Sequence, residues 1–150
     1  SKYDKIMRKE NGISFTSDEQ LGYNLFKQKC ASCHSEPLFT DFSYRNNGLD
    51  LVSVDEGRSN ITGVQSDFGK FRVPSLRNIE YTGPYMHDGR FYNLDEVLEH
   101  YNSGVKASEI LDSSLKNGIQ LNSSERAQIK AFLKTLTDNE FIKNTLYGES

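Results

Sequence analysis

Residues 35–92 form a long stretch in which apolar side chains follow neither the period of a helix nor the alternation of a strand. The stretch is rich in Gly, Asn, Asp and Ser, and all three prolines of the chain lie within it. So long an irregular segment is uncommon inside a compact domain unless the loop is functional and something other than its own secondary structure orders it. A bound cofactor would supply that order.

Capping patterns predict three helices outside this segment, at residues 18–29, 94–102 and 123–136. The patterns are Ser17-Asp18-Glu19-Gln20, Asn93-Leu94-Asp95-Glu96 and Asn122-Ser123-Ser124-Glu125. The apolar residues expected on the inner faces are Leu21, Leu25 and Phe26, then Leu94, Val97, Leu98 and Tyr101, then Ile129, Phe132, Leu133 and Leu136. We therefore expect a mostly helical domain in which the first of these helices packs against the third.

The first predicted helix ends in Cys30-Ala31-Ser32-Cys33-His34, which has the C-x-x-C-H spacing of covalent c-type haem attachment. This spacing lets both thiols reach the two vinyl groups of one porphyrin, and the adjacent imidazole then lies under the iron as proximal ligand. Apolar residues make up 35% of the chain, or about 42% with its 11 glycines, against roughly 45–50% in ordinary domains. A haem would complete this small core. The bulky residues expected to line it are Leu38, Phe39, Phe42, Phe68, Phe71, Val73, Leu76 and Tyr81.

Other uses of a cysteine pair fit the sequence less well. A thioredoxin-like pair lies in a βαβ setting, but the residues after Cys33 show neither a β-branched run nor a crossover helix. A zinc site needs four ligands, and the chain has no second C-x-x-C, while His87 and His100 are not at paired ligand spacing. A lone structural disulfide between Cys30 and Cys33 stays open.

Three ordered motifs resemble the C-terminal haem domain of bacterial di-haem cytochrome c peroxidases and of the related MauG enzymes. They are Phe71-Arg72-Val73-Pro74-Ser75-Leu76-Arg77-Asn78, Thr82-Gly83-Pro84-Tyr85-Met86-His87-Asp88-Gly89-Arg90-Phe91 and Leu94-Asp95-Glu96-Val97-Leu98-Glu99-His100-Tyr101. The resemblance extends over about residues 14–145 and implies an all-α, cytochrome c-like domain over 13–150, with long loops enclosing the haem. Residues 1–12 are charged and are expected to be a strap from a missing preceding domain.

The resemblance also indicates the sixth ligand of the iron. In the peroxidases this ligand is a Met fourteen residues after the His of the P-Y-x-H-D-G motif, which corresponds here to Tyr101, and the MauG branch has a Tyr at that place. Tyr101 would therefore bind the iron opposite His34. A phenolate favours ferric or higher states, whereas a thioether raises the potential. Met86 is the alternative ligand, as in single-haem cytochromes c, and an open iron beside a purely structural Tyr101 also stays open.

Three further residues have expected roles near the haem. His87 is expected to be a buried loop histidine that bonds near a propionate or to the loop backbone. Arg72 and Arg77 are candidates to pair with propionates, although both could be ordinary surface charges. His100 points about 100° away from Tyr101 on a helix and is expected at the surface.

A calcium ion is implied by the resemblance alone, because the di-haem peroxidases hold one between their haem domains. Carbonyl groups of the Thr and Pro in the T-x-P-Y-x-H segment contribute to that site, and Thr82 and Pro84 match them. The remaining ligand belongs to the other domain, so an ion bound here would be only partly caged.

The function expected from the resemblance is the relay of electrons or oxidising equivalents to a second, peroxide-reacting haem in an N-terminal domain absent from this chain. An electron-donor protein or small redox partner would act with it, in the periplasm where c-type haem is attached. The net charge of −3 and the lack of a long apolar run argue against nucleic acid and a membrane span. No acid–base residue for O–O cleavage stands out, so we expect the isolated chain to be nearly inactive. The alternative is a mono-haem carrier with His34 and Met86 as ligands.

Overall fold

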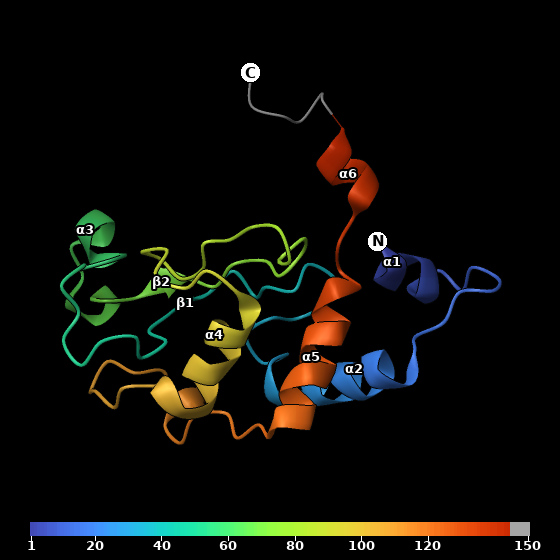
Figure 1. Ribbon diagram of the computed structural model, residues 1–150. Helices are drawn as coiled ribbons and strands as arrows, with labels where there is room; N and C mark the ends of the chain where they lie inside the picture. The colour runs from blue at the N-terminus through green and yellow to red at the C-terminus, as the bar shows by residue number, and fades with distance from the viewer. Residues whose placement is uncertain (145–150) are drawn as a thin grey trace.

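The computed structural model describes residues 1–144 as a helix-rich domain (Figure 1). Its helices are α1 (Lys2–Met7), α2 (Ser17–Lys29), α3 (Ser59–Thr62), α4 (Leu94–Glu99), α5 (Ser123–Lys134) and α6 (Asn139–Lys143). Shorter turns are the 3₁₀ segments Gln65–Asp67 and Ser113–Leu115 and the π-helical segment His100–Gly104. The structure also contains two short antiparallel strands that the sequence did not predict, β1 (Tyr44–Arg45) and β2 (Phe71–Arg72).

Helices α2 and α5 pack against each other and form the centre of the core, as predicted (Figure 1). Phe132 of α5 is fully buried and stacks on Tyr23 of α2, with ring centroids 4.9 Å apart. Phe26 lies 5.2 Å from the same ring. The inner faces predicted for the second and third helices are largely confirmed, because Leu94, Leu98, Ile129, Phe132, Leu133 and Leu136 are buried, while Val97 and Tyr101 are half-buried. Helix α5 ends at Lys134, two residues before the predicted end, and α4 gives way to the π-helical segment after Glu99.

Helix α2 begins one residue earlier than its sequence pattern indicated. Thr16 is the N-cap, and its hydroxyl accepts a hydrogen bond from the Glu19 amide while the Glu19 carboxylate accepts one from the Thr16 amide. The predicted cap, Ser17, is therefore the first helical residue. Leu21 was expected on the inner face but is 45% exposed, whereas Tyr23, on the opposite side of the helix, packs against the core.

Helix α1 packs onto the core through Tyr3, which is buried. Its amide donates to the Thr135 carbonyl oxygen at 3.0 Å, and its ring lies 5.0 Å from that of Phe39. The Tyr3 hydroxyl donates to the Glu36 carboxylate, which also accepts from the Tyr23 hydroxyl at 2.8 Å. Whether residues 1–12 are a strap from another domain stays a prediction.

Side-chain bonds to backbone groups hold the irregular segments together. The Thr40 hydroxyl donates to the Val73 carbonyl oxygen at 2.7 Å, and the Asn46 amide donates to that of Gly69 at 2.8 Å. Arg45 forms ion pairs with Asp41 and Asp112.

Among the described residues, no helix combines the length and apolar character that crossing a bilayer requires.

Candidate functional site

The C-x-x-C-H residues form a tight turn at the C-terminal end of α2. Cys30 caps the helix, with its amide donating to the Phe26 carbonyl oxygen at 2.8 Å. The amides of Cys33 and His34 then both donate back to the Cys30 carbonyl oxygen, at 3.2 and 3.0 Å. Both thiols are free, so the alternative of a structural disulfide is not realised. The turn brings two thiols and one imidazole together on the chain.

The orientation of His34 is set by two backbone carbonyl groups. Its Nδ1 lies 3.0 Å from the Phe39 carbonyl oxygen and 3.2 Å from that of Pro74. Since both of these oxygens are acceptors, Nδ1 carries the proton. Among residues 1–144, Nε2 has no hydrogen-bond partner. This is how metal-binding histidines are usually held, with one ring nitrogen bonded to the protein and the other directed to the metal.

Burial favours the uncharged forms of two residues of this turn, His34 and Cys30. It lowers the pKa of His34, against the opposing effect of its two backbone bonds, and so favours the neutral imidazole that binds metals. Burial also raises the pKa of the Cys30 thiol to about 12, so this thiol stays protonated at neutral pH.

Tyr101 lies in the π-helical segment that continues α4. The carbonyl oxygen of Tyr101 accepts a hydrogen bond from the Ile119 amide at 2.7 Å, and the side chain of Asn102 accepts one from the Leu121 amide at 2.8 Å. These bonds fix the carbonyl group of the tyrosine and the residue that follows it. Burial raises the pKa of Tyr101 to about 12, and the nearby Asn47 amide opposes the rise.

Met86, the alternative sixth ligand, lies next to Asn47. It sits in the loop between Tyr85 and Phe91, which is closed by a hydrogen bond of 2.7 Å from the Tyr85 amide to the Phe91 carbonyl oxygen. Its sulfur accepts a hydrogen bond from the side-chain amide of Asn47 at 3.2 Å. The structure thus brings both candidate sixth ligands, Tyr101 and Met86, to Asn47, a residue that the sequence did not single out.

The surface position expected for His100 is wrong. His100 is only 6% exposed, and its Nε2 lies 2.9 Å from the Asn47 carbonyl oxygen, to which it donates. The segment around Asn47 covers the helix face that a lone amphipathic helix would leave in water. Burial lowers the pKa of His100, which favours the neutral ring.

The burial expected for His87 is also wrong, because this residue is exposed and stacks on Phe71 with ring centroids 3.8 Å apart. Arg72 is exposed and lies over the Phe42 ring at 5.1 Å. Arg77 bonds both carboxylate oxygens of Asp4 at 2.8 Å. It also donates to the Pro37 carbonyl oxygen, at 3.0 Å from Nε and 2.6 Å from an Nη. Its guanidinium therefore already has a structural role, and pairing of either arginine with a propionate stays a prediction.

The residues expected to line a haem fall into three groups by burial, and Phe68, Phe71 and Leu76 form the half-buried one. Phe39 and Val73 are buried in the protein, and Phe39 belongs to the core between α1, α2 and α5. Leu38, Phe42 and Tyr81 are between 50 and 60% exposed, so they have apolar surface left for another group. Thr82 and Pro84, whose carbonyl groups were expected to contribute to a calcium site, are exposed. Within residues 1–144, no three or more acidic, His or Cys side chains cluster in a way that could hold a metal ion.

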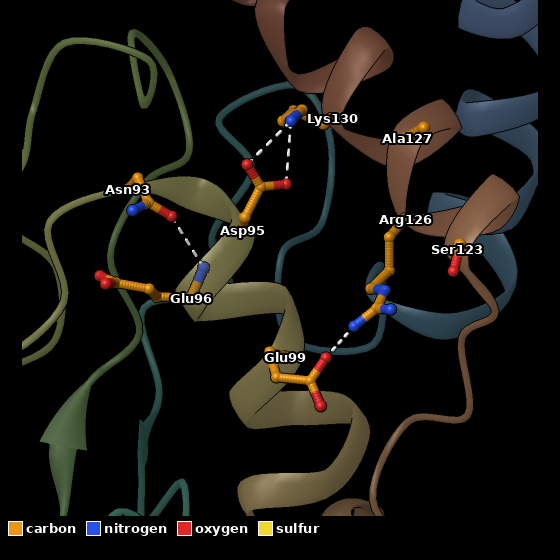
Figure 2. A pocket seen from close by; sticks show the side chains of 8 residues that line it. All are labelled: Asn93, Asp95, Glu96, Glu99, Ser123, Arg126, Ala127 and Lys130. Atoms are coloured by element: carbon orange, nitrogen blue, oxygen red, sulfur yellow. Dashed lines mark hydrogen bonds and ion pairs between the residues drawn. The ribbon is translucent and has the colours of Figure 1, made fainter.

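A surface pocket lies between α4 and α5, and neither cysteine is among its lining residues (Figure 2). Its rim carries two ion pairs, one between Glu99 and Arg126 and one between Asp95 and Lys130 at 2.8 Å. Figure 2 shows these side chains bridging the two helices. These two ion pairs join α4 to α5.

Comparison with known proteins identifies the family. No protein-family model matches the chain. The chain is 34% identical over 145 residues to cytochrome c551 peroxidase of Nitrosomonas europaea, which covers 93% of this chain and 40% of that protein. It is 31% identical to the methylamine utilization protein MauG of Paracoccus denitrificans, over 94% of this chain and 47% of that protein. The chain belongs to the di-haem cytochrome c peroxidase and MauG family.

Solved structures agree with this family. A MauG-like protein associated with microbial copper homeostasis superposes with a TM-score of 0.87 at 33% identity, over 99% of this chain and 55% of that one. The diheme peroxidase BthA of Burkholderia thailandensis shares the fold, with a TM-score of 0.73 at 20% identity over 100% of this chain and 50% of that one. The chain therefore spans about half the length, or less, of the family members that it matches.

Proposed function

We propose that this chain is the C-terminal haem domain of a di-haem peroxidase or MauG-like oxidase. The observation that carries the proposal is the orientation of His34, whose Nδ1 is bonded to the carbonyl oxygens of Phe39 and Pro74 while Nε2 is left for a metal. Family membership adds support, because the diheme peroxidase BthA shares the fold.

The residues present fit a covalently attached c-type haem. Cys30 and Cys33 would hold it through thioethers, since both thiols are free and lie on one tight turn. His34 would be the proximal ligand in its neutral form. The exposed faces of Leu38 and Phe42, together with the other bulky residues of 35–92, would enclose it. When bound, the haem supplies one-electron redox chemistry at iron.

Tyr101 is our proposed sixth ligand. Its carbonyl oxygen is held by the bond from the Ile119 amide, and its place in the sequence is that of the tyrosine in the MauG branch. An anionic phenolate stabilises oxidised iron, so a domain of this kind would hold oxidising equivalents better than it would accept electrons. Met86 is the second candidate ligand, and it would give a mono-haem electron carrier of higher potential.

In the parent protein, this domain would pass electrons or oxidising equivalents between an external redox partner and a peroxide-reacting haem in an N-terminal domain. Thr82 and Pro84 would contribute carbonyl oxygens to a calcium ion between the two domains, and residues 1–12 would be the strap that leads into this one. Haem attachment would place the protein in the periplasm. Without the second domain, the chain is expected to have little peroxidase activity.

The test is expression of the chain with the cytochrome c maturation machinery, followed by intact-mass and absorption measurements. We expect the mass to rise by one haem that stays bound in denaturant. The double variant Cys30→Ser with Cys33→Ser should lose this covalent haem, whereas Ser32→Ala, in the same turn, should keep it. Recovery of the bare polypeptide mass from matured wild-type protein would refute the proposal.

A further inference from the structure

Asn47 lies where three segments that are distant in sequence meet. Its side-chain amide donates to the Met86 sulfur at 3.2 Å, and its backbone carbonyl accepts from His100 Nε2 at 2.9 Å. Tyr101 follows His100 directly in the π-helical segment, and the rings of these two residues are 5.2 Å apart. One asparagine therefore contacts the thioether candidate and is bonded to the helix that carries the phenol candidate.

The backbone around Asn47 has little freedom. The side-chain oxygen of Asn46 accepts from the Gly48 amide at 3.0 Å, and the Gly48 carbonyl oxygen accepts from the Lys106 amide at 2.7 Å. Gly48 has φ +68°, and a Cβ added to it would lie 2.7 Å from the Val105 side chain. A side chain is therefore excluded at this position both by conformation and by space. Asn47 is thus fixed on each side by contacts that do not involve its own amide.

Met86 is fixed against the same segment. Its φ of +72° is unusual for a residue with a side chain and is retained only where the surroundings enforce it. Arg90, four residues later, pairs with Asp50 at 2.7 Å and with Asp88 at 2.6 Å. This pairing ties the Met86 loop to the residues that follow Asn47, so the contact between Asn47 and the sulfur is part of a braced arrangement.

We propose that Asn47 is a positioning residue that directs the sixth coordination position of the haem to Tyr101 and withholds it from Met86. The proposal rests on the function proposed above. A thioether that accepts a hydrogen bond through one lone pair, and is oriented by that bond, is a poorer metal ligand than an unbonded one. The bond from His100 keeps Asn47 next to the helix from which Tyr101 projects.

The test uses the haem-loaded chain and three substitutions at one position. Asn47→Leu keeps the approximate volume and removes the donor, and Asn47→Asp keeps the shape and replaces the donor with an acceptor. Both should free the sulfur, so the ferric near-infrared magnetic circular dichroism should change from bands of phenolate ligation to bands of thioether ligation, and the midpoint potential should rise. Asn47→Gln retains an amide and should restore the wild-type bands. Asn60→Leu, on the exposed helix α3, is the matched control and should change neither measurement.

The outcomes separate this inference from the function on which it rests. Adding Met86→Leu to Asn47→Leu should abolish the thioether bands, and a change that persists in the double variant would overturn the inference. So would wild-type bands and potential in a haem-loaded Asn47→Leu or Asn47→Asp protein, or thioether bands in the wild type. Absence of covalent haem from matured wild-type protein would refute the proposed function itself, and the inference with it.

Discussion

Gly22 of α2 lies directly against the main-chain carbonyl group of Gln128 in α5. A Cβ added at Gly22 would collide with that carbonyl oxygen and would also reach the Cβ of Phe132 at 3.0 Å. Neither neighbour is the flexible end of a side chain, so relief would require the helix backbones to separate. The absence of a side chain at Gly22 therefore sets how closely the two central helices approach.

Gly22→Ala should destabilise the domain by about 2–3 kcal/mol, because overpacking a rigid contact costs more than the gain in helix propensity. Urea denaturation followed by circular dichroism measures the change in the free energy of unfolding. Asn24→Ala, on the exposed face of the same helix, is the control and should cost little. Equal stabilities for the two variants would contradict the close approach of α2 and α5.

Phe132→Ala should cost about 3–5 kcal/mol of unfolding free energy. Its ring is fully buried and lies within 6.2 Å of the rings of Tyr3, Tyr23, Phe26 and Phe39, so truncation would leave a cavity shared by α1, α2 and α5. Leu21→Ala removes an apolar side chain that is 45% exposed and should change stability by less than about 1 kcal/mol. Thermal and urea denaturation of both variants provide the comparison.

Asp4→Asn should lower stability at neutral pH and have no effect in strong acid. Burial raises the pKa of Asp4, but the hydrogen bonds from Ser1 and Arg77 outweigh it and bring the pKa down from 3.8 to about 2. The charged carboxylate thus adds stability above its unfolded pKa, and this contribution is lost as the pH falls through about 2. We expect about 1–2 kcal/mol at pH 7, allowing for solvent screening.

The measurement for Asp4→Asn is the difference in unfolding free energy from wild type between neutral pH and pH 2. Glu109→Gln, which neutralises an exposed carboxylate, is the control, and its unfolding free energy should differ little from that of wild type at either pH. A deficit in Asp4→Asn that stays constant down to pH 2 would show that the loss comes from packing and not from the charge.

Tyr101→Phe should alter the ferric spectrum of the haem-loaded chain, whereas Met86→Leu should leave it unchanged. The reason is that only the first substitution removes the oxygen that we propose as ligand. Tyr92→Phe makes the same chemical change at a residue that is 80% exposed and should have no effect. The reverse pattern, with sensitivity to Met86→Leu alone, would favour the mono-haem electron carrier.

The helices could be predicted because their signals are local. The cap at Asn122 and the apolar spacing of Ile129, Phe132 and Leu133 need only one turn of chain to be recognised, and the structure confirms them. The start of α2 shows the limit of such signals. Thr16 with Glu19 and Ser17 with Gln20 both have the spacing of a capping box, and the structure uses the first pair. Helix α1 was not predicted, because its sequence is charged and has no repeated apolar spacing, and Tyr3 is its single buried residue.

The distal side of the site could not be predicted, because it depends on segments far apart in sequence. His100 has the spacing of a surface residue on an isolated helix, yet Asn47, 53 positions earlier, covers it. Asn47 belongs to no motif and carries no charge, so only its contacts with Met86 and His100 reveal it. The attachment turn, by contrast, is five consecutive residues and needs no tertiary information to be recognised.

The π-helical turn at His100–Gly104 makes the length of this segment matter as much as its residues. The alignment with the MauG protein of Paracoccus denitrificans extends over 184 positions although this chain has 150, so family members differ by inserted residues. A surface loop absorbs such an insertion. One residue more or fewer ahead of Tyr101 in this helix would rotate Tyr101 and Asn102 by about 100° and carry them away from their bonds to Ile119 and Leu121.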